Sequence, residues 1–200
     1  MNKLPVLYSF RRCPYAIRAR FALMLANKQV ELREVNLKDK PNELIHASPK
    51  ATVPVLVLCS GEVIDESLDI VDYALPHQLS ATLSTIYKEL LAELKNTLTP
   101  AIIDIKYKGS TNFTPVHQYL ERLNHLLSQN KYIASGELTK LDISIFPLIR
   151  QLYRINPEWF TDLGYHFVNR WLHSILDLPV FKSIMIKHPA WKPYQAAITL

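Results

Sequence analysis

The chain has 200 residues, 48% of them hydrophobic, which is enough for one large domain or two small ones with a proper core. Its formal net charge is +5, but no run of Lys or Arg exceeds two residues, so the charge pattern gives no support to a nucleic-acid partner. Two cysteines are too few for a disulfide framework, and we find neither a signal-peptide core nor the ~20 consecutive apolar residues of a membrane span. These features predict a cytoplasmic protein with free thiols and no membrane partner.

The first 76 residues alternate predicted strands and helices. Runs of β-branched and alternating apolar residues indicate strands, and apolar residues at helical spacing indicate helices. In chain order we predict a strand over 6–10, a helix over 14–26, a strand over 30–35, a short helix over 42–46, a strand over 52–58, an edge strand over 62–64 and a helix over 67–74. This β-α-β-α-β-β-α order is that of the thioredoxin fold.

The pattern breaks at residues 76–79, and everything after it is predicted to be helical. One amphipathic stripe runs over 83–105 with an expected kink at Pro100. Thr139 and Asp142 form a capping-box variant before a helix that is apolar nearly all round and therefore central. Further helices are predicted over 113–127, 143–153, 167–176 and 180–187. The sequence thus predicts an α/β domain over 1–76 and an all-helical bundle over 80–200.

Cys13 is the strongest candidate for chemistry. It stands at the N-cap of the first predicted helix, because Pro14 suits a first helical turn. Free backbone N–H groups and the positive end of the helix dipole favour a thiolate there. Two N–H···S⁻ hydrogen bonds of ~1.5 kcal/mol each, with smaller help from Arg11 and Arg12, would lower the thiol pKa from about 8.5 to about 6.

The residues around Cys13 resemble a known family of thiol enzymes. Cys-Pro-Tyr-Ala resembles the Cys-Pro-Tyr-Cys motif of glutaredoxins, with Ala16 in place of the second cysteine. With the preceding strand and the Arg-x-Arg of residues 18–20, it resembles omega- and beta-type glutathione transferases and their bacterial relatives. The resemblance implies the glutathione transferase fold, glutathione as co-substrate and a homodimer. Since Ala16 cannot form a disulfide, a mixed disulfide on Cys13 would need a second thiol, such as glutathione, for its release.

The resemblance also implies how glutathione is bound. Pro54 stands where the family has a cis-proline, so we expect a cis Val53–Pro54 bond that leaves the Val53 N–H and C=O to pair with the extended tripeptide. Relatives usually have Gly in the preceding loop. Ala51, which stands there in this chain, can adopt positive φ only at a cost.

Three further positions complete the implied glutathione site. Ser67 begins a predicted helix, so its hydroxyl and nearby free N–H groups could hold the γ-glutamyl carboxylate, and Glu66 could accept from the γ-glutamyl ammonium. Together they match the Glu-Ser pair of glutathione transferases. Lys40 matches the omega-type lysine near the glycyl carboxylate, although by itself it is more typical of a solvated loop charge. Tyr15 of the motif is the remaining implied binding residue.

The predicted function is a glutathione-dependent thiol transferase or reductase that acts on a small electrophilic or disulfide substrate through Cys13. Two alternatives stay open. A conjugating transferase would activate glutathione with a hydroxyl of the first strand, Tyr8 or Ser9, and a non-catalytic protein of this fold would resemble stringent starvation protein. No His pair has the i, i+4 spacing of a helical metal site, so no metal is predicted. Cys59, which lacks a cap or charged partner, is expected in the core.

Overall fold

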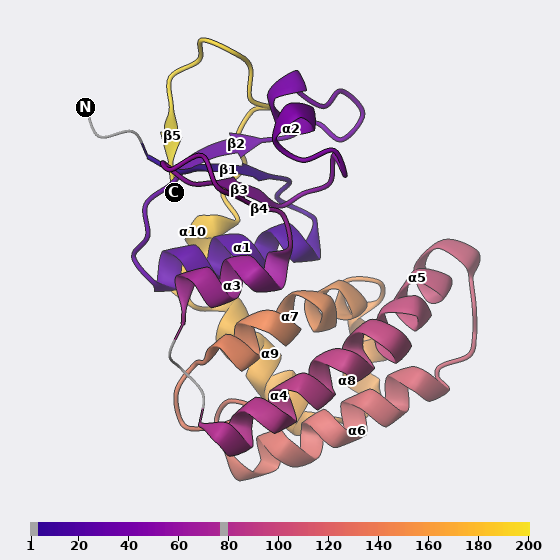
Figure 1. The fold of residues 1–200 in the computed structure, drawn as a ribbon. Coiled ribbons are helices and arrows are strands. Elements are labelled where there is room, and N and C mark those ends of the chain that lie inside the picture. The colour runs from indigo at the N-terminus through magenta and orange to yellow at the C-terminus, as the bar shows by residue number, and fades with distance from the viewer. Residues whose placement is uncertain (1–3, 77–79) are drawn as a thin grey trace. The chain divides into compact units, whose positions relative to one another are not determined.

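The computed structural model describes residues 4–76 and 80–200 (Figure 1). The chain divides into two compact units, one of Met1–Pro76 with Leu178–Leu200 and one of His77–Asp177. Residues 77–79 of the predicted domain break lie outside the described residues. Within residues 4–76 and 80–200, no helix is both long and apolar enough to cross a bilayer.

The first unit is built on a five-stranded mixed sheet in the order β4-β3-β1-β2-β5. Strand β1 pairs parallel with β2 and antiparallel with β3, and β3 pairs antiparallel with β4. Helices α1 and α3 pack together on one face of this sheet, and α2 lies on the other (Figure 1). The thioredoxin-like order is confirmed by β1 (Val6–Ser9), α1 (Pro14–Leu25), β2 (Glu31–Glu34), α2 (Asn42–Ala47), β3 (Val55–Val57), β4 (Val63–Ile64) and α3 (Ser67–Ala74).

The C-terminal segment belongs to this first unit, whereas the sequence predicts it as part of the helical domain. Helix α10 (Pro179–Ile184) packs against α1, and β5 (Ile198–Thr199) pairs antiparallel with β2. The amide of Leu200 donates to the Val30 carbonyl at 3.0 Å, which closes the same ladder. The segment therefore covers the β2 edge, which would otherwise expose unpaired backbone groups.

The second unit is helical, as predicted. Pro100 lies in the first turn of α5, directly after a π-helical turn at Leu94–Leu98, so the helix is irregular next to the proline, while the expected kink itself stays a prediction. A prolyl ring lacks an N–H and crowds the preceding turn, which a locally wider helix accommodates. The helices are α4 (Ala81–Glu93), α5 (Thr99–Lys108), α6 (Thr114–Gln129), α7 (Lys140–Tyr153), α9 (His166–Leu176) and the short α8 (Pro157–Asp162), which the sequence pattern does not predict.

The predicted capping box before α7 is present, and its carboxylate does more than cap. Asp142 Oδ2 accepts hydrogen bonds from the backbone N and Oγ1 of Thr139, each at 2.9 Å. Its Oδ1 accepts from the Ile133 amide at 2.9 Å and from Trp171 Nε1 at 2.8 Å. Asp142 is fully buried, and burial raises its pKa while these four donors lower it in part. One carboxylate thus joins α7, α9 and the loop before α7.

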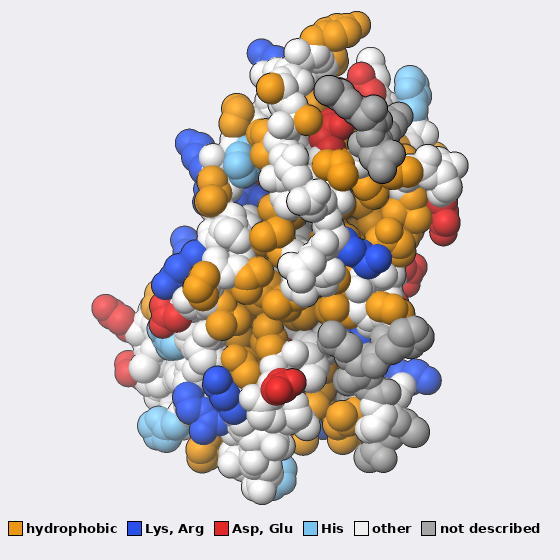
Figure 2. All heavy atoms as spheres, turned by 90° about the vertical axis from the view of Figure 1, so that its left-hand side faces the viewer, with side chains coloured by type: hydrophobic (Ala, Val, Ile, Leu, Met, Phe, Trp, Pro, Cys, Tyr) orange, Lys and Arg blue, Asp and Glu red, His pale blue; other side chains and the backbone are white. Residues whose placement is uncertain are grey.

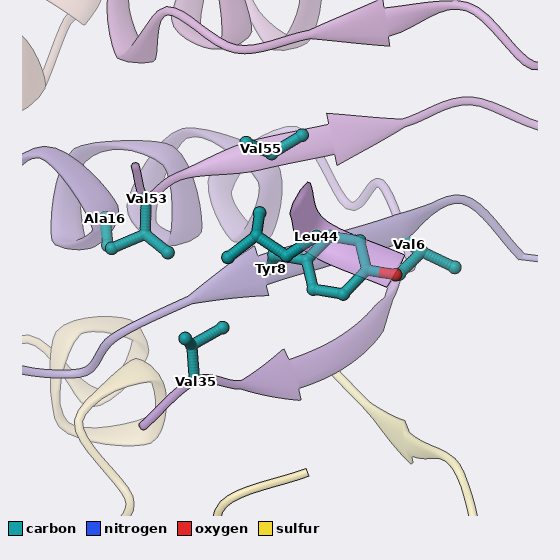
Figure 3. Packing of buried hydrophobic residues seen from close by; sticks show 7 residues of the cluster. All are labelled: Val6, Tyr8, Ala16, Val35, Leu44, Val53 and Val55. Atoms are coloured by element: carbon teal, nitrogen blue, oxygen red, sulfur yellow. The ribbon is translucent and has the colours of Figure 1, made fainter. Parts of the chain in front are cut away.

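The core of the first unit extends to the start of α1. Figure 3 shows Ala16 of α1 and Val53 of the loop before β3 together at one end of this cluster. Phe10 and Cys13 are partly buried and pack against it. The same packing that holds the sheet therefore fixes the position of Cys13. The buried members are Val6, Tyr8, Ala16, Val35, Leu44, Val53 and Val55.

On the one face that Figure 2 draws, the positive charge is dispersed. On the face drawn in Figure 2, Lys and Arg side chains are scattered among neutral and hydrophobic ones. This distribution agrees with the sequence, in which the excess of 23 Lys and Arg over 18 Asp and Glu contains no long basic run.

Candidate functional site

Cys13 lies where the turn after β1 meets α1. The Cys13 amide donates to the Phe10 carbonyl at 2.9 Å, and Pro14 is the first helical residue. The Val53–Pro54 bond is cis, which confirms that prediction. Cys13 Sγ lies 3.7 Å from the Val53 carbonyl oxygen, close enough for a weak S–H···O hydrogen bond. The cysteine and the cis-proline loop are therefore in contact.

The acidity of Cys13 differs from the prediction. Burial raises the pKa of the thiol and outweighs the opposing effects of the Ala16 and Tyr15 amides and of the Arg18 charge. The Cys13 side chain closes no cap hydrogen bond of normal geometry, although the Ala16 and Tyr15 amides lie close enough to Sγ to lower its pKa in part. The predicted pKa of about 6 is thus wrong in direction, because the helix-terminus argument omits the apolar cluster against which the sulfur packs.

The raised pKa predicts the pH dependence of Cys13 alkylation. A thiol with a raised pKa stays protonated at pH values where free cysteine, with a pKa of about 8.5, already ionises. The iodoacetamide rate in a Cys59→Ser protein, in which Cys13 is the remaining thiol, should therefore reach half its maximum above the midpoint measured for free cysteine. A midpoint below that of free cysteine would show that the helix amides and Arg18 outweigh burial.

Arg18 is a site residue that the prediction did not single out. It is almost fully buried on α1, and its Nη1 donates to Ser67 Oγ at 2.9 Å. Its guanidinium also lies 5.6 Å from the centre of the Tyr15 ring. Arg18 thus connects Tyr15 to Ser67, at the start of α3, and brings a positive charge near Cys13. The available signal was a charged residue inside an otherwise apolar helix, where a buried charge needs partners.

The acidic start of α3 is tied to the loop before the cis-proline. Lys50 Nζ lies 2.7 Å from Glu66 Oε1 and 3.1 Å from Asp65 Oδ1, and Ser48 Oγ donates to Asp65 at 2.7 Å. Glu66, which directly precedes Ser67 in the chain, thus has a carboxylate that is already paired to an exposed lysine. Lys40 is exposed in the loop before α2, and no contact links it to the other predicted residues in the described part of the chain.

The loop before the cis-proline has Ala51 where related proteins usually have glycine. Ala51 adopts a positive φ of 49°, and its amide donates to the Ser48 carbonyl at 2.8 Å. A non-glycine residue in this region costs roughly 1–2 kcal/mol. The glycine conformation is therefore kept in this loop although the residue is alanine.

The two hydroxyls of β1 are occupied by structural contacts. The Tyr8 hydroxyl accepts from Arg33 Nη1 at 2.9 Å, and its ring belongs to the buried cluster. Ser9 is fully buried, and its Oγ accepts from Arg20 Nε at 2.7 Å. Neither hydroxyl is presented to a substrate, which disfavours the hydroxyl-based alternative.

The second cysteine does not lie where it was expected. Cys59 is exposed in the turn between β3 and β4 rather than buried in the core. The strand β3 ends at Val57, one residue earlier than predicted, and Cys59 falls in the turn that follows. Any thiol experiment on Cys13 therefore has to account for a second accessible sulfur.

Sequence comparison connects this geometry to a family. The model of the "Glutathione S-transferase, N-terminal domain" matches residues 7–79. A Caenorhabditis elegans protein named "Probable maleylacetoacetate isomerase" is 30% identical, and the alignment covers 96% of both chains. The chain belongs to the glutathione S-transferase family. Glutathione S-transferase omega-1 of Sus scrofa is 25% identical over 92% of this chain and 77% of its own length. Glutaredoxin 2 of Escherichia coli is 28% identical over 73% and 84%.

Solved structures show the same glutathione S-transferase fold. Glutathione transferase Omega 1C from Trametes versicolor superposes with a TM-score of 0.80 at 17% identity, covering 92% of each chain. A glutathione S-transferase from Methylobacillus flagellatus, solved with glutathione bound, gives a TM-score of 0.74 at 18% identity and covers 90% of this chain and 98% of its own. At these identities the likeness establishes the fold alone.

Proposed function

We propose that this glutathione S-transferase family member is a cysteine-type thiol transferase. The observation that carries the proposal is the position of Cys13 at the start of α1, 3.7 Å from the Val53 carbonyl oxygen, with Ala16 one helical turn later. A nucleophilic sulfur is thus held beside the loop on which the tripeptide is expected, without a second thiol next to it. Such a site forms a mixed disulfide but cannot resolve it internally.

The reaction consists of two thiol–disulfide exchanges. The Cys13 thiolate attacks the glutathione sulfur of a mixed disulfide between glutathione and the substrate, which forms a Cys13–glutathione disulfide and releases the substrate thiolate to take up a proton. A second glutathione thiolate then attacks the glutathione sulfur of this disulfide. Oxidised glutathione leaves, and the Cys13 thiolate is regenerated. The substrate is reduced by two electrons, and the reduced glutathione consumed is recovered in oxidised glutathione.

The residues around Cys13 fit a bound glutathione. Ser67, at the start of α3, has a hydroxyl held by Arg18 Nη1, so the γ-glutamyl carboxylate would meet a guanidinium as well as the helix amides. Glu66 would take the γ-glutamyl ammonium in exchange for Lys50, a partner that is exposed and easily displaced. Tyr15, Lys40, Val53 and Pro54 remain the other proposed contacts. On this proposal the Val53 carbonyl, which accepts from the Cys13 thiol in the free protein, accepts from the backbone of the bound tripeptide instead.

The relatives support the choice of co-substrate and chemistry. The Methylobacillus flagellatus structure is described with glutathione bound, and glutaredoxin 2 carries a name that denotes disulfide chemistry. The second substrate is proposed to be a small disulfide or electrophile. A homodimer and a cytoplasmic location remain predictions from the resemblance and the composition.

Trapping with oxidised glutathione tests the proposal. In a Cys59→Ser background, intact-mass analysis should show one glutathione added at Cys13, and reduced glutathione should remove it. In the same background, Ala16→Cys should replace the stable adduct by an internal disulfide, because residues 13 and 16 share a helix face. If the protein forms no adduct with Cys13 intact, the thiol-transfer mechanism is abandoned.

A further inference from the structure

A cavity lies next to the turn that carries Cys13. It has a volume of about 350 Å³, and all its lining residues belong to the first unit. The turn after β1 forms one wall, the end of β2 a second, and the chain after α10 a third. The polar lining residues are Arg11, Arg12, Glu34, Asn36, Lys187 and His188. Arg12 directly precedes Cys13, and Phe10, whose carbonyl accepts from the Cys13 amide, also lines the cavity, so the cavity lies against the turn that carries Cys13.

The charges of this cavity are unbalanced. Glu34 is its single acid, and both oxygens of that carboxylate are used: Oε1 accepts from the Arg11 amide at 2.7 Å, and Oε2 pairs with the buried Arg20. The Glu34 charge is therefore compensated by Arg20, which is buried and does not line the cavity. Among the described residues, no carboxylate forms an ion pair with the side chains of Arg11, Arg12 or Lys187. Three cationic side chains thus face a cavity whose acid is already neutralised.

The wall contributed by the chain after α10 is anchored on both sides of the cavity. On the N-terminal side of residues 187–190, Arg11 Nη1 donates to the Met185 carbonyl at 3.2 Å, and Arg20 Nη1 donates to the Ile184 carbonyl at 3.0 Å. On the C-terminal side of these residues, the Trp191 amide donates to the Glu34 carbonyl at 2.7 Å, and the Arg33 guanidinium lies 4.2 Å from the centre of the Trp191 ring. Residues 187–190 are therefore held in place, which lowers the entropy cost of binding a ligand there.

We propose that this cavity is a carboxylate-binding site that holds an anionic group of the second substrate beside Cys13. Guanidinium groups match the planar geometry of a carboxylate, and Asn36 adds a neutral donor. The substrate class is a small disulfide or thiol that bears one or two carboxylates. This substrate preference rests on the proposed thiol transfer, whereas anion binding itself does not.

Binding is measured first, independently of catalysis. Succinate is titrated into the intact protein while the backbone amides of Asn36 and Lys187 are followed by NMR. We expect saturable shifts at both amides, and about tenfold weaker binding in the Arg12→Gln/Lys187→Gln double variant, the size expected for two partly exposed charge contacts. Lys192→Gln, an exposed lysine of the same segment outside the cavity lining, should bind like the unaltered protein. Absence of shifts, or equal binding by the double variant, would overturn the site.

Substrate preference is measured second. With glutathione as reductant, the double variant should raise KM about tenfold for dithiodiglycolate, which carries two carboxylates, and leave KM for the neutral 2-hydroxyethyl disulfide unchanged. An equal change for both disulfides would contradict a carboxylate site. If neither disulfide is reduced by the unaltered protein, the proposed thiol transfer fails while the succinate titration still decides the site.

Discussion

Replacing Asp142 by alanine should lower the free energy of unfolding of the helical unit by about 3–5 kcal/mol, because two buried N–H groups and a partly buried one lose their acceptor at once. These are the amides of Ile133 and Thr139 and the indole Nε1 of Trp171, all within 2.9 Å of the carboxylate. Their positions in the loop, the cap and α9 prevent them from sharing another acceptor. Urea unfolding followed by tryptophan fluorescence measures the change, since Trp171 is itself part of the network.

Two matched variants separate this network from a general effect of removing an acid. Asp142→Asn keeps one acceptor oxygen but turns an NH₂ group toward donors. We therefore expect it to lower the free energy of unfolding by somewhat less than Asp142→Ala does. Asp162→Ala removes an exposed acid at the end of α8 and should change stability by less than about 0.5 kcal/mol. If Asp142→Ala matched Asp162→Ala, the four-donor carboxylate would not hold the bundle together.

The order of the first-unit elements and the start of α7 in the second unit could be predicted from local patterns alone. Pro14 and Ser67 mark helix starts, the strands show their apolar pattern, and Thr139 with Asp142 marks a capping box. Each of these signals lies within a few neighbouring residues, so it can be recognised without knowing which distant residues are in contact. The placement of Cys13 at a helix N-terminus beside a cis Val53–Pro54 bond follows from the same local signals together with the family resemblance.

What the sequence did not predict depends on contacts between distant residues. Strand β5 has two residues and no alternation, and pairing with β2 is what makes it a strand. The pKa of Cys13 depends on an apolar cluster drawn from several elements, which a helix-terminus argument does not include. Arg18 became a site residue only when α1 packed against α3 and brought its guanidinium to Ser67.

The loss of activity in Cys13→Ala is the second large effect that we expect. A nucleophile that forms a covalent intermediate cannot be replaced by its neighbours, so disulfide reduction should fall by at least about a thousandfold. Glutathione binding should persist, because the proposed contacts at Ser67, Val53 and Lys40 are unchanged. Tyr8→Phe should retain thiol transfer, since that hydroxyl is held by Arg33 within the first unit.

The most direct test of the catalytic cysteine is the glutathione-dependent reduction of 2-hydroxyethyl disulfide by Cys13→Ala, Cys59→Ser and Tyr8→Phe proteins of verified fold. We predict that Cys13→Ala is inactive although it still binds glutathione, and that Cys59→Ser and Tyr8→Phe stay within about threefold of the unaltered protein. A Cys13→Ala protein that kept its disulfide-reducing activity would contradict Cys13 as the nucleophile.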